Sequence, residues 1–190
     1  MSRALDLVLA TAGLIVAAPV LGASMVAIRL GSPGPAIYRQ RRVGKDGREF
    51  DLLKLRTMVQ GSDPVGIGTP IEEGDPRITR IGAPLRRFSL DELPNLVNVL
   101  RGEMAIVGPR PTIPAQVAEY SERQRRRLDV KPGLTGWAQI NGRTSLEWTD
   151  RIELDVWYVE HRSLALDLRI LARTAGLLLS GRGLYTGDKR

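Results

Sequence analysis

Two adjacent carboxylates, Asp91 and Glu92, follow the basic side chains Arg86 and Arg87 and form the stretch best suited to chemistry. Neighbouring carboxylates close to cations can hold a divalent cation, or can supply a nucleophile and a base. A structural interpretation is also open, because Ser89 and Glu92 have the spacing of a helix capping box and acidic residues favour the first turn of a helix. Spacing alone does not choose between these two interpretations.

Pro94 argues against a simple helix start at Ser89. The pattern of residues 90–100 is helical, and a helix capped by Ser89 would contain Pro94, whose missing N–H removes a backbone hydrogen bond. The alternative is a helix that restarts near Pro94. The two acids would then lie at an irregular junction.

Several basic side chains are candidates for binding phosphate. Arg110 lies between Pro109 and Pro111, which fix the backbone and forbid a helix, so its planar guanidinium could be presented rigidly to phosphate oxygens. Lys54 and Arg56 alternate along an expected strand and would therefore share one face. In both cases the alternative is a solvated side chain, on a proline-bracketed turn or on an exposed strand.

A glycine-rich segment, residues 131–143, carries a different set of candidates. Trp137, Gln139, Asn141 and Arg143 lie among its glycines. An aromatic ring with amide groups could bind a base and a sugar. The alternative is a packed tryptophan with amides that stabilise a loop. Because the segment holds three glycines and one proline, we expect a structured loop rather than a helix or strand.

Composition limits the classes of function. The chain has 190 residues, enough for one domain with a core, and its 28 Lys and Arg against 21 Asp and Glu give a net charge of +7. A basic surface suits nucleic acid, an anionic lipid surface or a phosphorylated substrate. The lack of cysteine excludes disulfides and thiolate metal sites, and a single histidine, His161, excludes a His-rich metal cluster. We expect His161 to be a structural or surface residue.

An apolar run, residues 7–28, precedes all of these candidates. It is uncharged, with only Thr11 and Ser24 as polar interruptions, and it is long enough to cross a bilayer. Its length and its start close to the terminus disfavour a cleaved signal peptide. Arg3 precedes the run and Arg29 follows it. Because Lys and Arg favour the cytoplasmic side, basic flanks at both ends suggest that both ends stay inside.

Pro19 lies near the middle of this run and predicts a kink at Ala18 and Pro19. A helix that enters one leaflet, bends there and returns would agree with the basic flanks, while a proline-kinked helix that crosses fully is the alternative. We therefore predict a re-entrant membrane helix over residues 1–30 and a cytoplasmic domain over residues 31–190, forming one functional unit.

The remainder of the chain predicts an α+β fold: a small β-hairpin or sheet and several amphipathic interface helices beside the re-entrant membrane helix. Two β-like runs joined by an Asp-Gly turn indicate the hairpin. The later helical patterns mix Leu, Ile, Trp and Tyr with Arg, which suits a helix in the membrane interface and equally a core-facing helix with a basic side. The predicted elements are strands at residues 36–43 and 48–58, a surface loop at 61–76, and helices at 90–100, 114–128 and 149–180.

Taken together, the sequence resembles the bacterial sugar transferase family, and within it the small monotopic phosphoglycosyl transferases. Several long motifs occur in the order of the family and run through nearly the whole chain. The chain would be the minimal form, without the additional spanning helices of larger members. One departure is the pair Ala18-Pro19, where many members have Ser-Pro. The matching segments are the apolar N-terminus and residues 51–58, 75–82, 89–94, 108–111 and 131–143.

The resemblance implies a reaction and a set of site residues. Asp91 would attack the sugar-bearing phosphorus of a UDP-sugar, release UMP and carry the phosphosugar until a polyprenyl phosphate, such as undecaprenyl phosphate, accepts it. Glu92 would assist by accepting a proton, and Mg²⁺ would bridge Asp91 and the diphosphate. The implied substrate-binding residues are Arg56, Arg86, Arg110, Trp137, Gln139 and Arg143.

The resemblance also places the protein on the cytoplasmic face of a bacterial inner membrane, in contact with membrane lipids, at the start of a polysaccharide or glycoconjugate pathway. Two rival classes are a nucleic-acid-binding module and a non-enzymatic membrane scaffold. The first leaves the apolar N-terminus and the paired acids unexplained, so we expect no nucleic-acid partner. Intact Asp91, Glu92 and Arg110 argue against the second. The sequence specifies neither the transferred sugar nor the oligomeric state.

Overall fold

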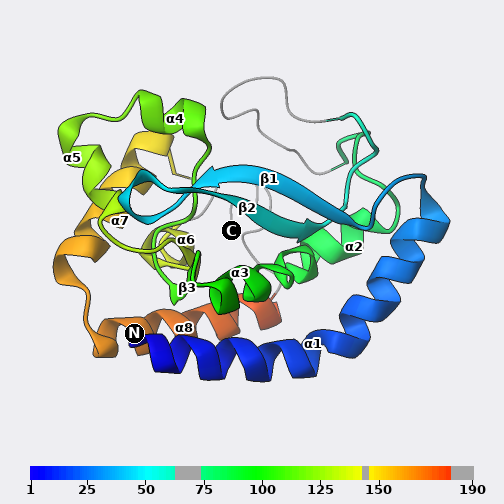
Figure 1. Cartoon of the computed structure of the whole chain (residues 1–190), viewed down its shortest axis with the longest axis horizontal. Coiled ribbons are helices and arrows are strands. Elements are labelled where there is room, and N and C mark those ends of the chain that lie inside the picture. The colour runs from blue at the N-terminus through cyan, green and yellow to red at the C-terminus, as the bar shows by residue number, and fades with distance from the viewer. Residues whose placement is uncertain (63–73, 143–145, 181–190) are drawn as a thin grey trace.

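The computed structural model describes residues 1–62, 74–142 and 146–180 and has the predicted α+β composition. In Figure 1 a long bent helix frames the molecule along its lower and right edges, with a β-hairpin across the middle and shorter helices between them. The strands are β1 (Ile37–Val43), β2 (Glu49–Leu55), β3 (Ala105–Val107) and β4 (Gly133–Thr135), and the α-helices are α1 (Arg3–Gly31), α2 (Gly82–Arg87), α3 (Asn95–Arg101), α4 (Pro114–Ala118), α5 (Glu122–Arg125), α6 (Trp137–Ile140), α7 (Trp148–His161) and α8 (Leu164–Ser180).

Helix α1 confirms the predicted apolar N-terminal helix and is long and apolar enough to cross a membrane. Pro19 lies near its middle, and Figure 1 shows that the helix changes direction between its two halves. A proline inside a helix removes one backbone hydrogen bond and crowds the preceding turn, which accounts for a bend.

The predicted hairpin is confirmed. Strands β1 and β2 pair antiparallel, from Ile37 with Leu55 to Val43 with Glu49. The turn between them has Asp46 at φ 56° and Gly47 at φ 75°, and an Asp-Gly pair tolerates such positive values better than other residue pairs do. The second strand ends at Leu55, three residues earlier than the sequence predicts.

The prediction that residues 131–143 form a loop is wrong in part. Strand β4 pairs parallel with β3, Ala105 opposite Gly133, and α6 follows it directly. The glycines serve close packing here, because a Cβ on Gly133 would lie 2.1 Å from the backbone nitrogen of Gly108. Pairing with a strand so distant in sequence leaves no local signal.

Two helix predictions also need correction. The predicted helix over 114–128 is divided into α4, α5 and a 3-10 turn η3 (Arg126–Leu128), because a capping box between Ser121 and Gln124 starts a new helix at Glu122. Residues 90–100 form a 3-10 turn η2 (Leu90–Glu92) followed by α3, whose N-cap is Pro94. At a helix start the missing N–H of proline costs no hydrogen bond. The predicted helical region 149–180 is confirmed as two helices, α7 and α8.

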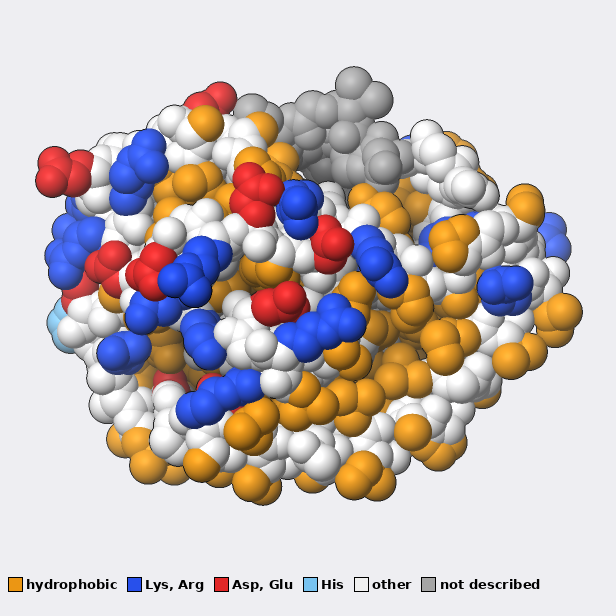
Figure 2. All heavy atoms as spheres, in the orientation of Figure 1, with side chains coloured by type: hydrophobic (Ala, Val, Ile, Leu, Met, Phe, Trp, Pro, Cys, Tyr) orange, Lys and Arg blue, Asp and Glu red, His pale blue; other side chains and the backbone are white. Residues whose placement is uncertain are grey.

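Both halves of α1 pack against the same body. Ala10 of the first half belongs to the main apolar cluster, with Leu96, Met104 and Ile170 among its members. Ile28 of the second half belongs to a separate cluster that includes Leu55 and Leu85. The outer side of α1 remains open, with Val16 and Leu30 exposed by 79% and 84%. Figure 2 shows apolar side chains gathered along the lower and right edges, where α1 runs.

Candidate active site

The two acids lie on η2, the short turn between α2 and α3, and η2 packs against β2. Ser89 precedes them with a left-handed backbone, φ 54°, and its side chain makes no capping hydrogen bond. The capping-box interpretation of Ser89 and Glu92 is therefore wrong. The alternative holds: the helix restarts at Pro94, and the acids lie at an irregular junction where neither carboxylate is used to cap the turn.

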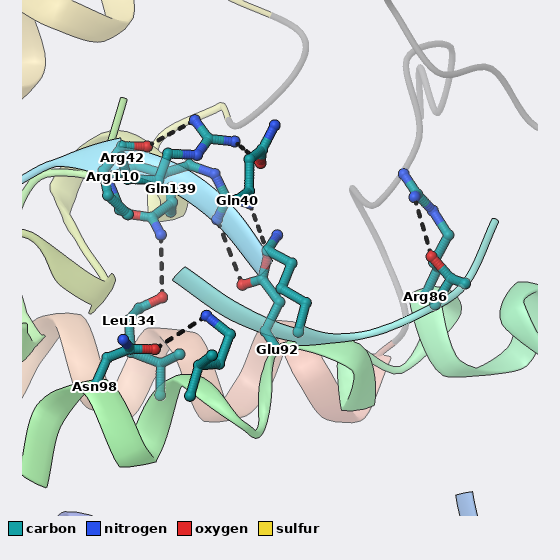
Figure 3. A network of polar contacts seen from close by, with 12 residues as sticks. Gln40, Arg42, Arg86, Glu92, Asn98, Arg110, Leu134 and Gln139 are labelled. Atoms are coloured by element: carbon teal, nitrogen blue, oxygen red, sulfur yellow. Dashed lines mark hydrogen bonds and ion pairs between the residues drawn. The ribbon is translucent and has the colours of Figure 1, made fainter. Parts of the chain in front are cut away.

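Glu92 is held by two cations from distant parts of the chain. Lys54 Nζ on β2 lies 2.8 Å from Glu92 Oε1, and Arg110 Nη2 lies 2.6 Å from the same oxygen. Figure 3 shows the Arg110 and Glu92 side chains pointing toward each other. Burial would raise the pKa of Glu92, but the positive charges of Arg110 and Lys54 outweigh it and hold the pKa well below its usual range. Glu92 is therefore an ionised, firmly oriented carboxylate.

Asp91 has the opposite environment. Asp91 is 8% exposed, and no described residue donates a hydrogen bond to its carboxyl group. Burial raises the pKa of Asp91 above its ordinary value, and the charge of Lys54 only partly opposes this. A buried carboxyl that is near cations but not bonded to them is available for a metal ion or an electrophile.

The turn that carries Arg110 is fixed at its backbone. Arg127 Nη2 donates to the carbonyl of Arg110 at 2.9 Å, and Arg42 Nη1 donates to the carbonyl of Pro111 at 3.1 Å. The backbone nitrogen of Gly108 donates to Thr135 in β4. The two prolines restrict the dihedral angles, and these bonds fix the position, so the rigid presentation of Arg110 expected from the sequence is present.

Arg42 is a residue that the sequence analysis did not select for this site. It lines a hollow beside Glu92 together with Lys54, Asn95 and Arg110. Burial and then the charge of Arg110 lower the pKa of Arg42 to about 10, which indicates a partly buried cation close to a second one. In the sequence, only the alternation of Arg42 with Gln40 along β1 could have indicated this residue. The pairing of β1 with β2 is what brings the strand close to the acids.

Asn95 is a second residue that the sequence analysis missed. It is 3% exposed at the start of α3, and its Oδ1 accepts no hydrogen bond from the described residues. A buried amide oxygen without a donor is costly. The hollow therefore combines cations with an acceptor that a ligand N–H or hydroxyl could satisfy.

The structure does not bring Arg56 and Arg86 to Glu92. Arg56 follows the end of β2 and is turned to the end of α1, where it donates to the carbonyls of Ile28, Ser32 and Pro33. Arg56 does not share a strand face with Lys54, contrary to the prediction from the sequence, because β2 ends at Leu55. Arg86 donates to Thr57 Oγ1 at 3.4 Å and lies apart from the Glu92 cluster in Figure 3, although its charge partly opposes the rise in the pKa of Asp91.

The aromatic and amide candidates are engaged in internal contacts. Trp137 stacks on Trp157 with ring centroids 5.0 Å apart. Gln139 donates to the carbonyl of Leu134 at 3.2 Å, and Asn141 donates to the carbonyl of Trp137. These contacts favour the packing interpretation of the segment. Arg143 lies outside the described residues.

Comparisons with known proteins agree with one another. A family model described as bacterial sugar transferase matches residues 1–181. A Bacillus subtilis protein named uncharacterized sugar transferase EpsL is 45% identical over 161 residues, covering 85% of this chain and 77% of the relative. Two proteins named UDP-glucose:undecaprenyl-phosphate glucose-1-phosphate transferase are each 44% identical: the Escherichia coli protein over 92% of this chain and 39% of its own length, and the Caulobacter vibrioides protein over 96% and 71%.

Proposed function

The chain belongs to the bacterial sugar transferase family, and we propose that it moves a phosphosugar from a UDP-sugar to a polyprenyl phosphate, with undecaprenyl phosphate as the carrier. The names of the relatives from Escherichia coli and Caulobacter vibrioides support this reaction class. The chain spans only 39% of the length of the Escherichia coli relative, and the acids and cations of its site support the same reaction.

The contrast between Asp91 and Glu92 carries the proposal. Asp91 is unpaired among the described residues, while Glu92 is held by Lys54 and Arg110. In the first step an Asp91 carboxylate oxygen bonds to the sugar-bearing phosphorus of the UDP-sugar. The bond from that phosphorus to the bridging oxygen breaks, and UMP leaves with that oxygen and its electron pair. The product is an aspartyl phosphosugar.

In the second step an oxygen of the polyprenyl phosphate attacks the same phosphorus and displaces the Asp91 carboxylate, which restores the enzyme. Both steps bring together anionic groups, and Lys54, Arg42 and Arg110 would neutralise their charge. A lowered pKa makes Glu92 a weak base. Its contacts favour a role in orienting Lys54 and Arg110 over the proton-accepting role that the family resemblance implies.

The acids of the site fit a magnesium ion. No described group of three or more Asp, Glu, His or Cys side chains could form an all-protein cage. Mg²⁺ commonly uses one or two carboxylates together with phosphate oxygens and water, and Asp91 offers an unbonded carboxylate beside the basic hollow. Asp91 would hold the ion, which supplies charge neutralisation for the diphosphate when bound.

A re-entrant α1 is part of the same proposal, with the catalytic body on the cytoplasmic face of the inner membrane. Near the start of the helix, Arg3 donates to the carbonyls of Val99 and Leu100. Near its end, Arg56 donates to the carbonyl of Ser32 at 2.9 Å. Both ends are thus bonded to one globular body, while the outer apolar side is open. In a helix that crossed the bilayer, the hydrocarbon core of about 30 Å would lie between the two ends. A body on the cytoplasmic face could then not bind both of them.

The basic cluster at 123–127 gives little support to a nucleic-acid-binding role. Arg123 pairs with Glu153, Arg126 with Glu160, and Arg127 with Asp155. These arginines therefore join η3 and α5 to α7 instead of forming an uncompensated basic surface of the kind that binds phosphate backbones.

One assay tests the proposed function. Purified protein in detergent or vesicles is given undecaprenyl phosphate, Mg²⁺ and a panel of UDP-sugars, and UMP release is measured together with lipid-linked phosphosugar. We expect one UDP-sugar to give UMP and lipid product in equal amounts. No UMP with any sugar would favour the scaffold alternative, and UMP release without lipid product would reject the proposed acceptor.

A further inference from the structure

We propose that the buried ion pair of Arg127 and Asp155 is a positioning pair for the active site, acting through the backbone of Arg110. The inference rests on the proposed function, because Arg110 is taken to bind substrate phosphate. In this role neither Arg127 nor Asp155 has to touch Asp91, Glu92 or the substrate.

The contacts form a continuous connection from α7 to Glu92. Arg127 Nη2 lies 2.5 Å from Asp155 Oδ2 and also donates to the Arg110 carbonyl at 2.9 Å. Arg127 Nη1 donates to the hydroxyl of Tyr120. The Arg110 side chain then reaches Glu92 at 2.6 Å. The same guanidinium group thus binds the acid on α7 and the peptide unit that carries Arg110.

The burial of this pair is poorly explained by stability alone. The two side chains are 7% and 2% exposed, and burial raises the pKa of Asp155 to about 6 in spite of Arg127. Removing two charges from water is expensive, and well-packed apolar residues often serve stability as well or better. What apolar residues cannot supply is a charged donor aimed at the Arg110 carbonyl.

The contact to the Arg110 carbonyl is one of two that hold this turn, and the carbonyl of Pro111 is bound by a different element. Arg42 on β1 donates to the Pro111 carbonyl at 3.1 Å, so consecutive peptide units of the turn are bound to η3 on one side and to β1 on the other. The Arg110 side chain is 48% exposed, and its guanidinium bonds to Glu92. Where that guanidinium lies depends also on the backbone that carries it, and a displacement of about 1 Å at a site can lower a rate by about 100-fold.

The test replaces Asp155 and uses its neighbour on the same helix as a control. Asp155→Asn removes the charge with little change of shape, and we expect kcat/KM for the UDP-sugar to fall about 10- to 100-fold. Glu153→Gln removes the surface pair with Arg123, whose side chains are 56% and 50% exposed, and should change kcat/KM by less than about twofold. Unchanged kinetics for Asp155→Asn would overturn the proposal.

A double-mutant cycle separates positioning from general damage. In an Arg110→Ala background, Asp155→Asn should cost less than about twofold further, since there is no guanidinium left to position. Equal losses in both backgrounds would show a merely structural role. Arg127→Lys serves if Asp155→Asn folds poorly, because an ammonium keeps a charge beside Asp155 without the planar fork that holds both partners. Tyr120→Phe keeps the Arg110 contact and should retain most activity.

Affinity for UDP, measured by calorimetry on the same four proteins of the cycle, distinguishes this inference from the proposed function. Non-additive loss of UDP affinity supports the positioning pair even where transfer is not detected. Additive loss in an active wild type rejects the pair and leaves the proposed function standing. Absence of both transfer and UDP binding in the wild type overturns both.

Discussion

Lys54 and Arg110 donate to the same carboxylate oxygen of Glu92, at 2.8 and 2.6 Å, although they are far apart in the sequence. This shared acceptor ties the hairpin strand β2 to the proline-bracketed turn. It also keeps both cations beside Asp91, whose own carboxyl makes no hydrogen bond to a described residue. The site is thus divided between an oriented acid, Glu92, and an available one, Asp91.

Asp91→Asn should lower turnover by at least about 1,000-fold, because an amide is a poor nucleophile and a poor metal ligand. UMP release from the UDP-sugar measures this directly. Mass spectrometry of the wild type trapped without lipid acceptor should show the added phosphosugar on Asp91, and the variant should show none. Near-normal turnover in Asp91→Asn would eliminate the covalent step.

Glu92→Gln should reduce turnover while leaving Asp91 able to react once with the UDP-sugar, because Glu92 orients the cations instead of attacking. It should also lower stability by about 1–3 kcal/mol at neutral pH. The folded-state pKa of Glu92 is lowered, so its ionised form stabilises the fold above about pH 4.5, and this contribution is lost as the pH falls toward the lowered value. Thermal unfolding of both proteins should therefore converge on acidification. A constant difference across pH would contradict the ion pairs.

Arg110→Lys should lower kcat/KM by about 10-fold or more even though the charge is kept, since an ammonium cannot form the planar bidentate contact with phosphate oxygens. Arg125→Lys, in the basic cluster at 123–127 on α5, is the matched control and should leave kcat/KM unchanged. The measurement is steady-state kinetics against UDP-sugar concentration. Equal behaviour of the two variants would make Arg110 an ordinary turn residue.

Removal of divalent cations should abolish transfer, because Asp91 and the diphosphate would repel each other without the positive charge that the ion would supply. Excess EDTA should stop UMP release, and added Mg²⁺ should restore it. The thermal midpoint of the substrate-free protein should change little, as the proposed ion has one carboxylate ligand from the chain. Full activity in EDTA would exclude the metal.

Both ends of α1 should face the cytoplasm. Cysteine is absent, so single cysteines at the exposed residues Ser2 and Pro35 can be labelled without background. An impermeant thiol reagent should label neither site in intact cells and both after lysis. Labelling of one site alone from the periplasm would establish a full crossing.

Pro19 is the matching test of the bend. Pro19→Leu restores the missing N–H and should straighten the helix, which would push part of the population across the bilayer and lower activity. The same labelling assay reports the result. Unchanged topology would assign the bend to the packing of α1 against Leu96 and Leu85.

Local pattern was sufficient for much of the fold. Apolar length predicted α1, Asp-Gly between β-like runs predicted the hairpin, and Pro94 allowed the restarted helix that leaves Asp91 and Glu92 at a junction. Each of these depends on neighbours in sequence, through backbone restriction or side-chain period. Pro109 and Pro111 likewise indicated a rigid Arg110, although nothing local identifies Glu92 as its partner.

Tertiary structure decided which charged groups meet. Arg56 and Arg42 are both strand-associated arginines in the sequence, yet the first binds the end of α1 and the second lies beside Arg110. The parallel pairing of β3 with β4 was likewise invisible locally. The sequence alone thus determined the family, the acids and the apolar helix, because those are carried by residue type and spacing. The opposite pKa shifts of Asp91 and Glu92 arise only when long-range packing sets burial and charge separation, and no spacing rule encodes those distances.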